Sequence, residues 1–141
     1  MERSTALVVD AGPLFAVADC DDREHERCTT LLHEFAGPKR VPVLTIAEVT
    51  HLMATRLHPE VELRFLAELT LGNLSVEPVH PSDWLRIAQL VEQYRDLRLG
   101  TVDASIVAAA ERLGVSTIAT LDRRHFSVVR PRHVEAFELV P

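Results

Sequence analysis

Hydrophobic residues follow two different spacings along the chain. In short runs they are consecutive and often β-branched, which predicts buried strands. In longer stretches they recur every three or four positions, which predicts helices with one apolar face. Strands are expected at 5–9, 40–44, 74–79, 116–120 and 134–139. Helices are expected between them, beginning near residues that cap or interrupt helices: Asp21 or Asp22, Thr45, Pro59, Ser82 and Gly100.

The alternation of strands and helices predicts the fold class. Strands linked by helices pair in parallel through right-handed crossovers, with helices on both faces of the sheet. We therefore expect an α/β fold, a three-layer α/β/α sandwich with a mainly parallel central sheet. The 141 residues are 47% hydrophobic, and no internal repeat or linker divides them. A single domain over residues 1–141 is the simplest organisation.

Four carboxylates lie where the chain leaves a predicted strand or enters a predicted helix. Asp10 directly follows the first strand, and Asp122 follows the fourth. Glu48 and Asp103 fall in the first turns of predicted helices, where capping is the ordinary role of an acid. Ligands of open α/β sheets bind beyond the carboxyl ends of the strands. Taken together, the four acids are therefore expected to converge at that edge.

Acids so close together favour a bound cation. Repulsion and partial burial raise carboxyl pKa values and oppose ionisation unless a cation is present. Oxygen donors suit Mg²⁺ or Mn²⁺, and Mg²⁺ often completes its coordination with water and substrate phosphates. No nucleophilic side chain belongs to the set, so the predicted chemistry is attack by a metal-activated water on a phosphodiester. None of the seven histidines is assigned as a ligand.

The net charge of -6 argues against a broadly basic surface for nucleic acid, because phosphate affinity comes mainly from Lys and Arg. A local basic rim is still compatible with the sequence. Arg123 and Arg124 directly follow Asp122, with Arg130 and Arg132 nearby, and we consider them candidates for RNA contacts. No apolar run is long enough to cross a bilayer and no signal-peptide pattern is visible, which favours a cytoplasmic protein.

Several segments carry a resemblance to a known family. Four of them are similar, in order and spacing, to PIN-domain ribonucleases, and specifically to VapC-type toxins of bacterial toxin-antitoxin modules: VVDAGPLFA, TIAEV, VDASIVAAAERLG and TLDRRHF. The resemblance covers nearly the whole chain and implies a PIN-like sandwich that cleaves RNA endonucleolytically. It implies that the acids bind Mg²⁺ or Mn²⁺, namely Asp10, Glu48, Asp103 and Asp122. Thr120 matches a hydroxyl residue that supports a carboxylate or water in the family.

The resemblance also implies partners. VapC-type toxins form homodimers and are blocked by a cognate VapB-type antitoxin, and an acidic chain suits a basic antitoxin segment. The predicted helical hairpin from Thr45 to Gly72 carries leucines that are not all needed on one core face. These are Leu52, Leu63 and Leu66. The hairpin is therefore a candidate for an apolar groove that takes a partner helix.

One departure from the family and two other functions bear on this interpretation. Many relatives carry Asp-Thr-Ser in the first motif, where this chain has Asp10-Ala11-Gly12, so a hydroxyl that could help to hold the metal is absent. A catalytically idle PIN-like module that binds RNA or protein is one alternative, but none of the four acids is missing. A phosphatase of the haloacid-dehalogenase type is another, but it needs a second Asp where Gly12 stands.

Overall fold

The computed structural model describes residues 5–141, which form a central sheet of five parallel strands. The strands are β1 (Leu7–Val9), β2 (Lys39–Pro42), β3 (Ser75–Glu77), β4 (Thr117–Ala119) and β5 (Glu138–Val140). They are ordered β3-β2-β1-β4-β5, and every neighbouring pair is parallel. The chain order reverses between β1 and β4, which is the place where ligands bind in open α/β sheets. The predicted fold class is confirmed.

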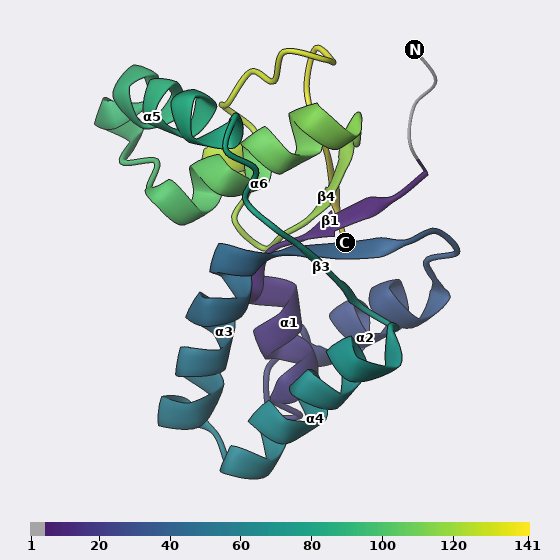
Figure 1. Cartoon of the computed structure of the whole chain (residues 1–141). Coiled ribbons are helices and arrows are strands. Elements are labelled where there is room, and N and C mark those ends of the chain that lie inside the picture. Colours follow the sequence, from purple (N-terminus) through teal and green to yellow (C-terminus); the bar gives the residue numbers. More distant parts are fainter. Residues whose placement is uncertain (1–4) are drawn as a thin grey trace.

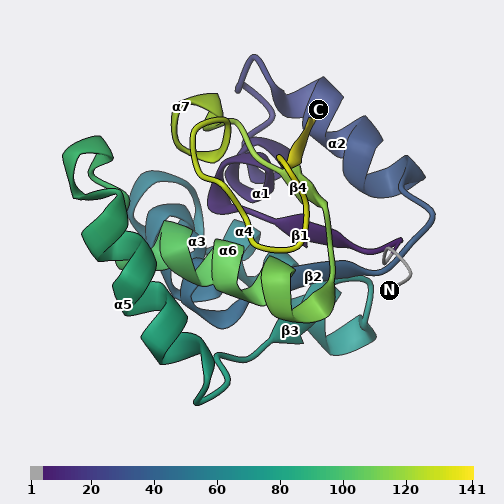
Figure 2. The ribbon, with the colours of Figure 1, turned by 90° about the horizontal axis from the view of Figure 1, so that it is seen from above.

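Helices cover both faces of the sheet. They are α1 (Ala11–Ala18), α2 (His25–Glu34), α3 (Val43–Arg56), α4 (Pro59–Leu71), α5 (Asp83–Gln93), the 3₁₀ helix η1 (Arg95–Leu97), α6 (Thr101–Leu113) and α7 (Arg123–Phe126). In Figures 1 and 2, α1 to α4 lie on one side of the sheet, and α5 and α6 lie on the other. Within residues 5–141, no helix is both long and apolar enough to span a membrane.

The central strand shows why the core has two halves. Successive side chains of a strand point to opposite faces. Leu7 and Val9 pack with residues of α1, α3 and α4 in one apolar cluster. Val8 packs in the other cluster, with Ile87 of α5 and Ile106 of α6. All three strand residues are fully buried, so β1 lies between the two helical layers and Asp10 emerges at its end.

Helix α1 departs from the sequence prediction, which placed no helix before Asp21 or Asp22, because the pair Gly12-Pro13 after the first strand is typical of a turn. The helix begins at Ala11, directly after β1, and Asp10 is its N-cap. Proline is tolerated in a first helical turn because the N–H groups there have no partner within the helix. The local signal for a turn was therefore also compatible with the start of a helix.

The capping prediction for Thr45 was wrong. Helix α3 begins at Val43 with Pro42 as N-cap, so Thr45 lies inside the first turn and is fully buried. Its hydroxyl has no hydrogen-bond partner among the described residues. Glu48 lies one turn further along α3 and is not part of a capping box.

Other boundaries shifted for local reasons. Asp22 accepts a hydrogen bond from the Glu24 N–H at 2.8 Å, and α2 begins only at His25. The last strand is β5, later than the predicted 134–139. Helix α7, of four residues, was not predicted, because so short a helix leaves no periodic pattern.

An ion-pair network joins the outer helices to the edge of the sheet. Arg112 at the end of α6 donates to Glu77 of β3 at 2.7 Å and to Asp83 of α5 at 3.1 Å. Both acids are buried, and Arg112 holds the pKa of Asp83 below its usual range even though burial acts in the opposite direction. Arg86 of α5 pairs with Glu111 of α6 at 2.7 Å. These contacts fix the helix that carries Asp103.

Candidate active site

Asp10 is held at the carboxyl end of β1 by two hydrogen bonds. Its Oδ1 accepts from the Ala11 N–H at 2.7 Å, and its Oδ2 accepts from the Thr120 hydroxyl at 2.8 Å. The Thr120 oxygen accepts in turn from the Asp122 N–H at 2.9 Å. One buried hydroxyl therefore connects the ends of β1 and β4 and fixes the orientation of Asp10.

Asp103 and Asp122 meet at the side chain of His125. The Nδ1 of His125 lies 2.9 Å from Oδ2 of Asp103 and 2.9 Å from Oδ2 of Asp122. The backbone N–H of His125 also donates to Oδ1 of Asp122, which is the N-cap of α7. Asp103 lies in the first turn of α6, whose N-cap is Gly100, so Asp103 is not a capping residue.

Electrostatic effects link the two halves of the cluster. Burial raises the pKa of Asp10 to about 6, and the charges of Asp103 and Glu48 add to this effect. Desolvation of its carboxyl group and the charge of Asp103 raise the pKa of Glu48, although the residue as a whole is exposed. Burial also raises the pKa of Asp103, and its contact with His125 opposes that rise. All four acids therefore lie within electrostatic range of at least one other.

The donor set fits a divalent cation. Buried carboxylates with raised pKa values are destabilised as anions, and a cation between them would reverse that effect. Ligand atoms of Asp103, Asp122 and His125 lie within 4.8 Å of one another. The other two acids add oxygen donors, which are the ligands preferred by Mg²⁺ and Mn²⁺. The arrangement can therefore hold a cation at the edge of the sheet where substrates bind.

The sequence model of the PIN domain matches residues 7–130 of the chain. The chain belongs to the PIN-domain family. Ribonuclease VapC26 of Mycobacterium tuberculosis is 33% identical over 135 residues, which span 96% of this chain and 100% of that protein. This PIN domain is thus similar over nearly its whole length to a VapC-type ribonuclease, as the four sequence segments implied.

Solved structures support the fold independently. VapC20 of Mycobacterium tuberculosis, described as a toxin that cleaves the sarcin-ricin loop, superposes with a TM-score of 0.81 at 17% identity and covers 92% of this chain and 98% of its own. The DNA-bound VapBC of Salmonella typhimurium gives a TM-score of 0.64 at 15% identity and covers 99% and 97%.

His125 is the residue of the site that sequence reasoning missed. Its side chain is 18% exposed and faces two acids, whereas no histidine was assigned as a ligand from the sequence. The signal was the spacing Asp122-x-x-His125 after a strand: an acid that caps a helix has the third residue of that helix beside it. The spacing alone did not assign His125 to the site, because its second partner, Asp103, lies 22 residues away in the sequence.

The arginines of the predicted rim differ in their surroundings. Arg123 donates to the backbone oxygen of Pro141 at 2.7 Å, and Arg132 donates to Gln89 at 2.8 Å. Arg124 is exposed on α7, beside the acids. A polar cleft of about 630 Å³ adjoins the site, and its lining includes Thr120, Arg123 and Arg27. It reaches the site through Thr120, and none of the four acids is among its lining residues.

Gly12, in the motif that lacks the family's hydroxyl residue, packs closely against Leu121. A Cβ atom at Gly12 would lie 3.3 Å from Cβ of Leu121, the residue that precedes Asp122. That separation is tighter than an ordinary van der Waals contact. Gly12 therefore lets the loop that carries Asp122 lie close against α1.

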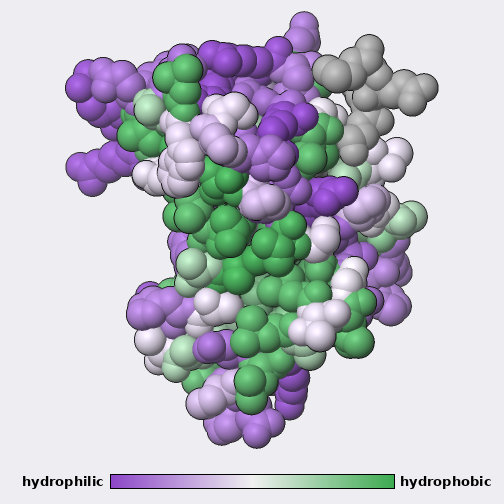
Figure 3. Space-filling model, in the orientation of Figure 1, coloured by the Kyte–Doolittle hydropathy of each residue, from purple (hydrophilic) through white to green (hydrophobic). Residues whose placement is uncertain are grey.

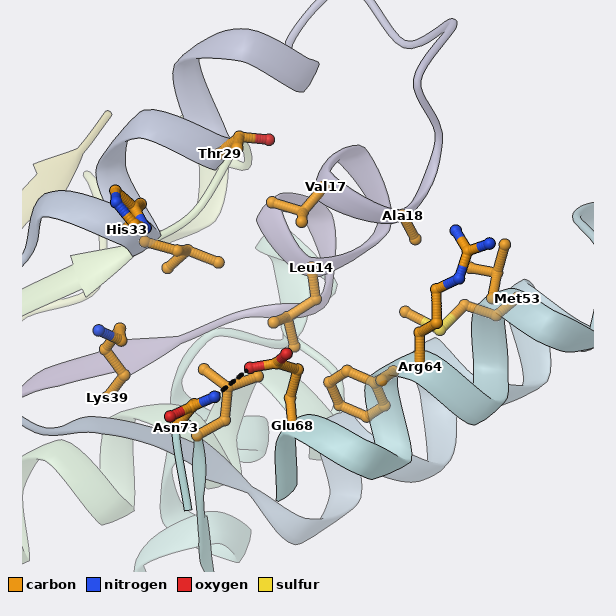
Figure 4. A pocket seen from close by; sticks show the side chains of 14 residues that line it. Leu14, Val17, Ala18, Thr29, His33, Lys39, Met53, Arg64, Glu68 and Asn73 are labelled. Atoms are coloured by element: carbon orange, nitrogen blue, oxygen red, sulfur yellow. Dashed lines mark hydrogen bonds between the residues drawn. The ribbon is translucent and has the colours of Figure 1, made fainter. Parts of the chain in front are cut away.

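An apolar groove lies among the helices that cover one face of the sheet. It has a volume of about 600 Å³ and is lined by α1, α2 and α4, with Leu14, Val17 and Phe65 among its apolar residues. Figure 4 shows these helices facing one another across it. The positively charged Lys39 and Arg64 also line it, and Glu68 there is hydrogen-bonded to Asn73 at 2.8 Å.

Helix α4 is apolar on two sides. Residues Val61, Arg64, Phe65 and Glu68 recur at helical spacing and line the groove. Leu63 and Leu66 lie on the other side of the helix and are 64% and 39% exposed. Together with the exposed Val43 and Val76, these two leucines define what we term the apolar face. Figure 3 shows apolar side chains gathered in a band across this side of the molecule.

Proposed function

We propose that this PIN domain is a divalent-metal-dependent endoribonuclease and the toxin of a type II toxin-antitoxin system. The observation that carries the proposal is that carboxylates near the switch point of the sheet raise one another's pKa values, in a chain that is 33% identical over 96% of its length to a VapC ribonuclease. A module that only binds RNA or protein would not need buried carboxylates, whose ionisation is unfavourable in the folded state.

The residues of the site would divide the work of hydrolysis. A bound Mg²⁺ or Mn²⁺ would activate water and stabilise charge on the phosphoryl group. Asp10, Glu48, Asp103 and Asp122 would hold it. The Thr120 hydroxyl already donates to Asp10 and accepts from the Asp122 N–H, so it orients carboxylates and is not free to attack. Arg124 and Arg123 would contact the phosphates that flank the cleaved bond.

RNA cleavage tests this proposal directly. The purified protein with Mg²⁺ or Mn²⁺ should cut a structured RNA internally, and a chelator should stop the reaction. Asp103→Asn should abolish cleavage without loss of folding, because the change removes a charge and keeps the shape. Asp96→Asn is the matched control, since Asp96 is exposed in η1 and has no place in the site. Cleavage by the Asp103→Asn protein at the wild-type rate would disprove the assignment.

The groove between α1, α2 and α4 is the surface that we propose for the VapB-type antitoxin. The predicted hairpin contributes α4 and Met53 of α3 to it, while α1 and α2 supply the other wall. Its apolar floor suits one face of a helix. Lys39 and Arg64 make the rim locally positive, so the complementary segment should carry acids beside its apolar residues, although the chain as a whole is acidic.

A charge placed in the groove tests this surface. Val17→Glu should prevent capture of the protein encoded beside this gene and leave RNA cleavage intact, because Val17 lines the groove and lies outside the acid cluster. Val128→Glu, at an exposed position that is not part of the groove lining, is the control. Undiminished capture by the Val17→Glu protein would place the antitoxin elsewhere.

The apolar face is the surface that we propose for homodimer formation. Contiguous exposed apolar side chains are unusual on monomeric proteins and often mark an interface. A twofold interface brings the same patch together from both subunits. Leu66→Glu should convert the dimer to a monomer in light scattering, whereas Leu85→Glu on α5 should not.

A further inference from the structure

We propose that Nδ1 of His125 is a ligand of the catalytic cation, and that this nitrogen makes the site prefer Mn²⁺ over Mg²⁺. The inference rests on the metal-dependent function proposed above and concerns a residue outside the four acids. It assigns a donor atom and a metal preference to the position between Asp103 and Asp122.

Both the backbone and the side chain of His125 contact Asp122. Its backbone N–H donates to Oδ1 of Asp122 at 3.1 Å, and its ring nitrogen lies 2.9 Å from Oδ2 of the same carboxylate. Phe126, the next residue, is 1% exposed and anchors α7 in the core. The imidazole is therefore held against the acids by packing and by the start of the helix.

The distances match those between neighbouring ligands of one ion. Nδ1 lies 2.9 Å from Oδ2 of Asp103 and 2.9 Å from Oδ2 of Asp122. Two ligands at right angles around an octahedral ion, each about 2.1 Å from it, are about 3.0 Å apart. Nδ1 thus has the spacing of an adjacent ligand to each of the two oxygens, and all three atoms lie within 4.8 Å of one another. A neutral imidazole that carries its proton on Nε2 leaves the lone pair of Nδ1 available.

The donor atoms on the two sides of the cluster differ in kind. Asp10 and Glu48 offer only oxygen, and both oxygens of Asp10 already accept hydrogen bonds. The side formed by Asp103, Asp122 and His125 combines oxygen with nitrogen. Mg²⁺ takes oxygen ligands almost exclusively, whereas first-row transition ions also accept imidazole. An ion bound on this side should therefore be Mn²⁺ when both ions are present at equal concentration.

A purely orienting role for His125 makes different predictions. In that role the ring only donates a hydrogen bond and holds two carboxylates in place, as residues around a metal site commonly do. Its loss would then weaken Mg²⁺ and Mn²⁺ binding alike. A side chain with a hydrogen-bond donor at the same position would restore the binding of both ions. Asparagine is such a donor, because its side-chain amide can occupy the position of Nδ1 but offers no lone pair on nitrogen.

The experiment uses the full chain, freed of metal and loaded with less than one equivalent of Mn²⁺. Pulsed electron paramagnetic resonance should detect coupling of bound Mn²⁺ to a directly coordinated ¹⁴N nucleus in the wild type. The coupling should disappear in both His125→Ala and His125→Asn. It should remain in His33→Ala, which removes an exposed imidazole on α2 as a control. Calorimetric titration should show the ratio of Mn²⁺ to Mg²⁺ affinity falling about tenfold in both His125 variants.

Two results with the variants would overturn the inference. The first is ¹⁴N coupling that persists in His125→Ala. The second is an equal loss of affinity for both ions that His125→Asn restores, which would leave His125 a positioning residue only. Metal-dependent RNA cleavage by a wild-type protein whose Mn²⁺ shows no nitrogen coupling would refute this inference alone. A wild-type protein that binds neither ion would refute the proposed function as well.

Discussion

Replacing Asp10 with asparagine should stabilise the metal-free protein. Burial raises the pKa of Asp10 from 3.8 to about 6. Each pKa unit corresponds to about 1.36 kcal/mol, so the ionised carboxylate costs about 3 kcal/mol near neutral pH. Asparagine removes that cost but weakens the hydrogen bond with Thr120, which is worth about 1 kcal/mol. The net gain should be about 2 kcal/mol, or a rise in Tm of about 5 °C.

The pH dependence gives the sign of the effect. Between pH values of about 4 and 6 the folded protein binds more protons at Asp10 than the unfolded chain does. The contribution of Asp10 to the free energy of unfolding therefore falls as pH rises through this window, and it stays low above it. The free energy of unfolding of the Asp10→Asn protein should lack this fall with rising pH. The assay is urea unfolding at a series of pH values in the presence of a chelator, with wild type and variant compared at each pH.

Two comparisons make the test specific. Asp96→Asn, at an exposed position in η1, should change stability by less than about 0.5 kcal/mol. Added Mn²⁺ should stabilise the wild type more than the Asp10→Asn protein, because ligands stabilise the state that binds them. If the metal-free variant is no more stable than wild type near neutral pH, or keeps the wild-type slope below it, Asp10 is not a destabilising anion and the reasoning fails.

Three further substitutions have clear expected outcomes. Arg112→Ala should lower the free energy of unfolding by about 3–5 kcal/mol in urea titrations, because it removes the arginine that pairs with buried Asp83 and leaves buried Glu77 only the more distant Arg40, at 3.7 Å. The exposed Arg95→Ala should cost about 0.5 kcal/mol, and equal losses would contradict the argument. Thr120→Ala should reduce the rate of RNA cleavage at least about tenfold while Thr120→Ser retains it, since the hydroxyl holds Oδ2 of Asp10 and the Ala11 N–H holds only Oδ1; a slow serine variant would show that the methyl group matters. Gly37→Ala should destabilise the protein by about 1–3 kcal/mol, because the new Cβ would lie 2.1 Å from the carbonyl oxygen of Thr5; an unchanged denaturation midpoint would mean that the start of the chain moves aside freely.

The sequence was sufficient for those parts of the site that depend on strand ends. Asp10 and Asp122 were identified because a buried strand precedes each of them, and parallel pairing brings such ends together. For Asp103 the sequence allowed two roles, helix capping or function. Gly100 is the N-cap of α6, and the side chain of Asp103 contacts His125. The roles of these acids in catalysis remain predictions until the variants are assayed.

The features that sequence reasoning missed depend on tertiary contacts or on very short elements. Helix α1 was missed because Gly12-Pro13 is typical of a turn and equally acceptable in a first helical turn. His125 was missed because its partner Asp103 lies 22 residues away and only the fold brings the two together. Thr45 was misplaced because its helix begins two residues earlier, after Pro42.

Helix α1 imposes two constraints on the same eight residues. Its first turn lies against Asp10 and the loop of Asp122, while Leu14, Val17 and Ala18 further along form a wall of the groove. If the groove receives the antitoxin, a mutation in α1 that alters inhibitor choice also risks disturbing the acids. In that case paralogues would diversify in specificity most safely through α2 and α4, which line the groove and carry none of the four acids. Related toxins that coexist in one cell should therefore differ more along these two helices than along α1.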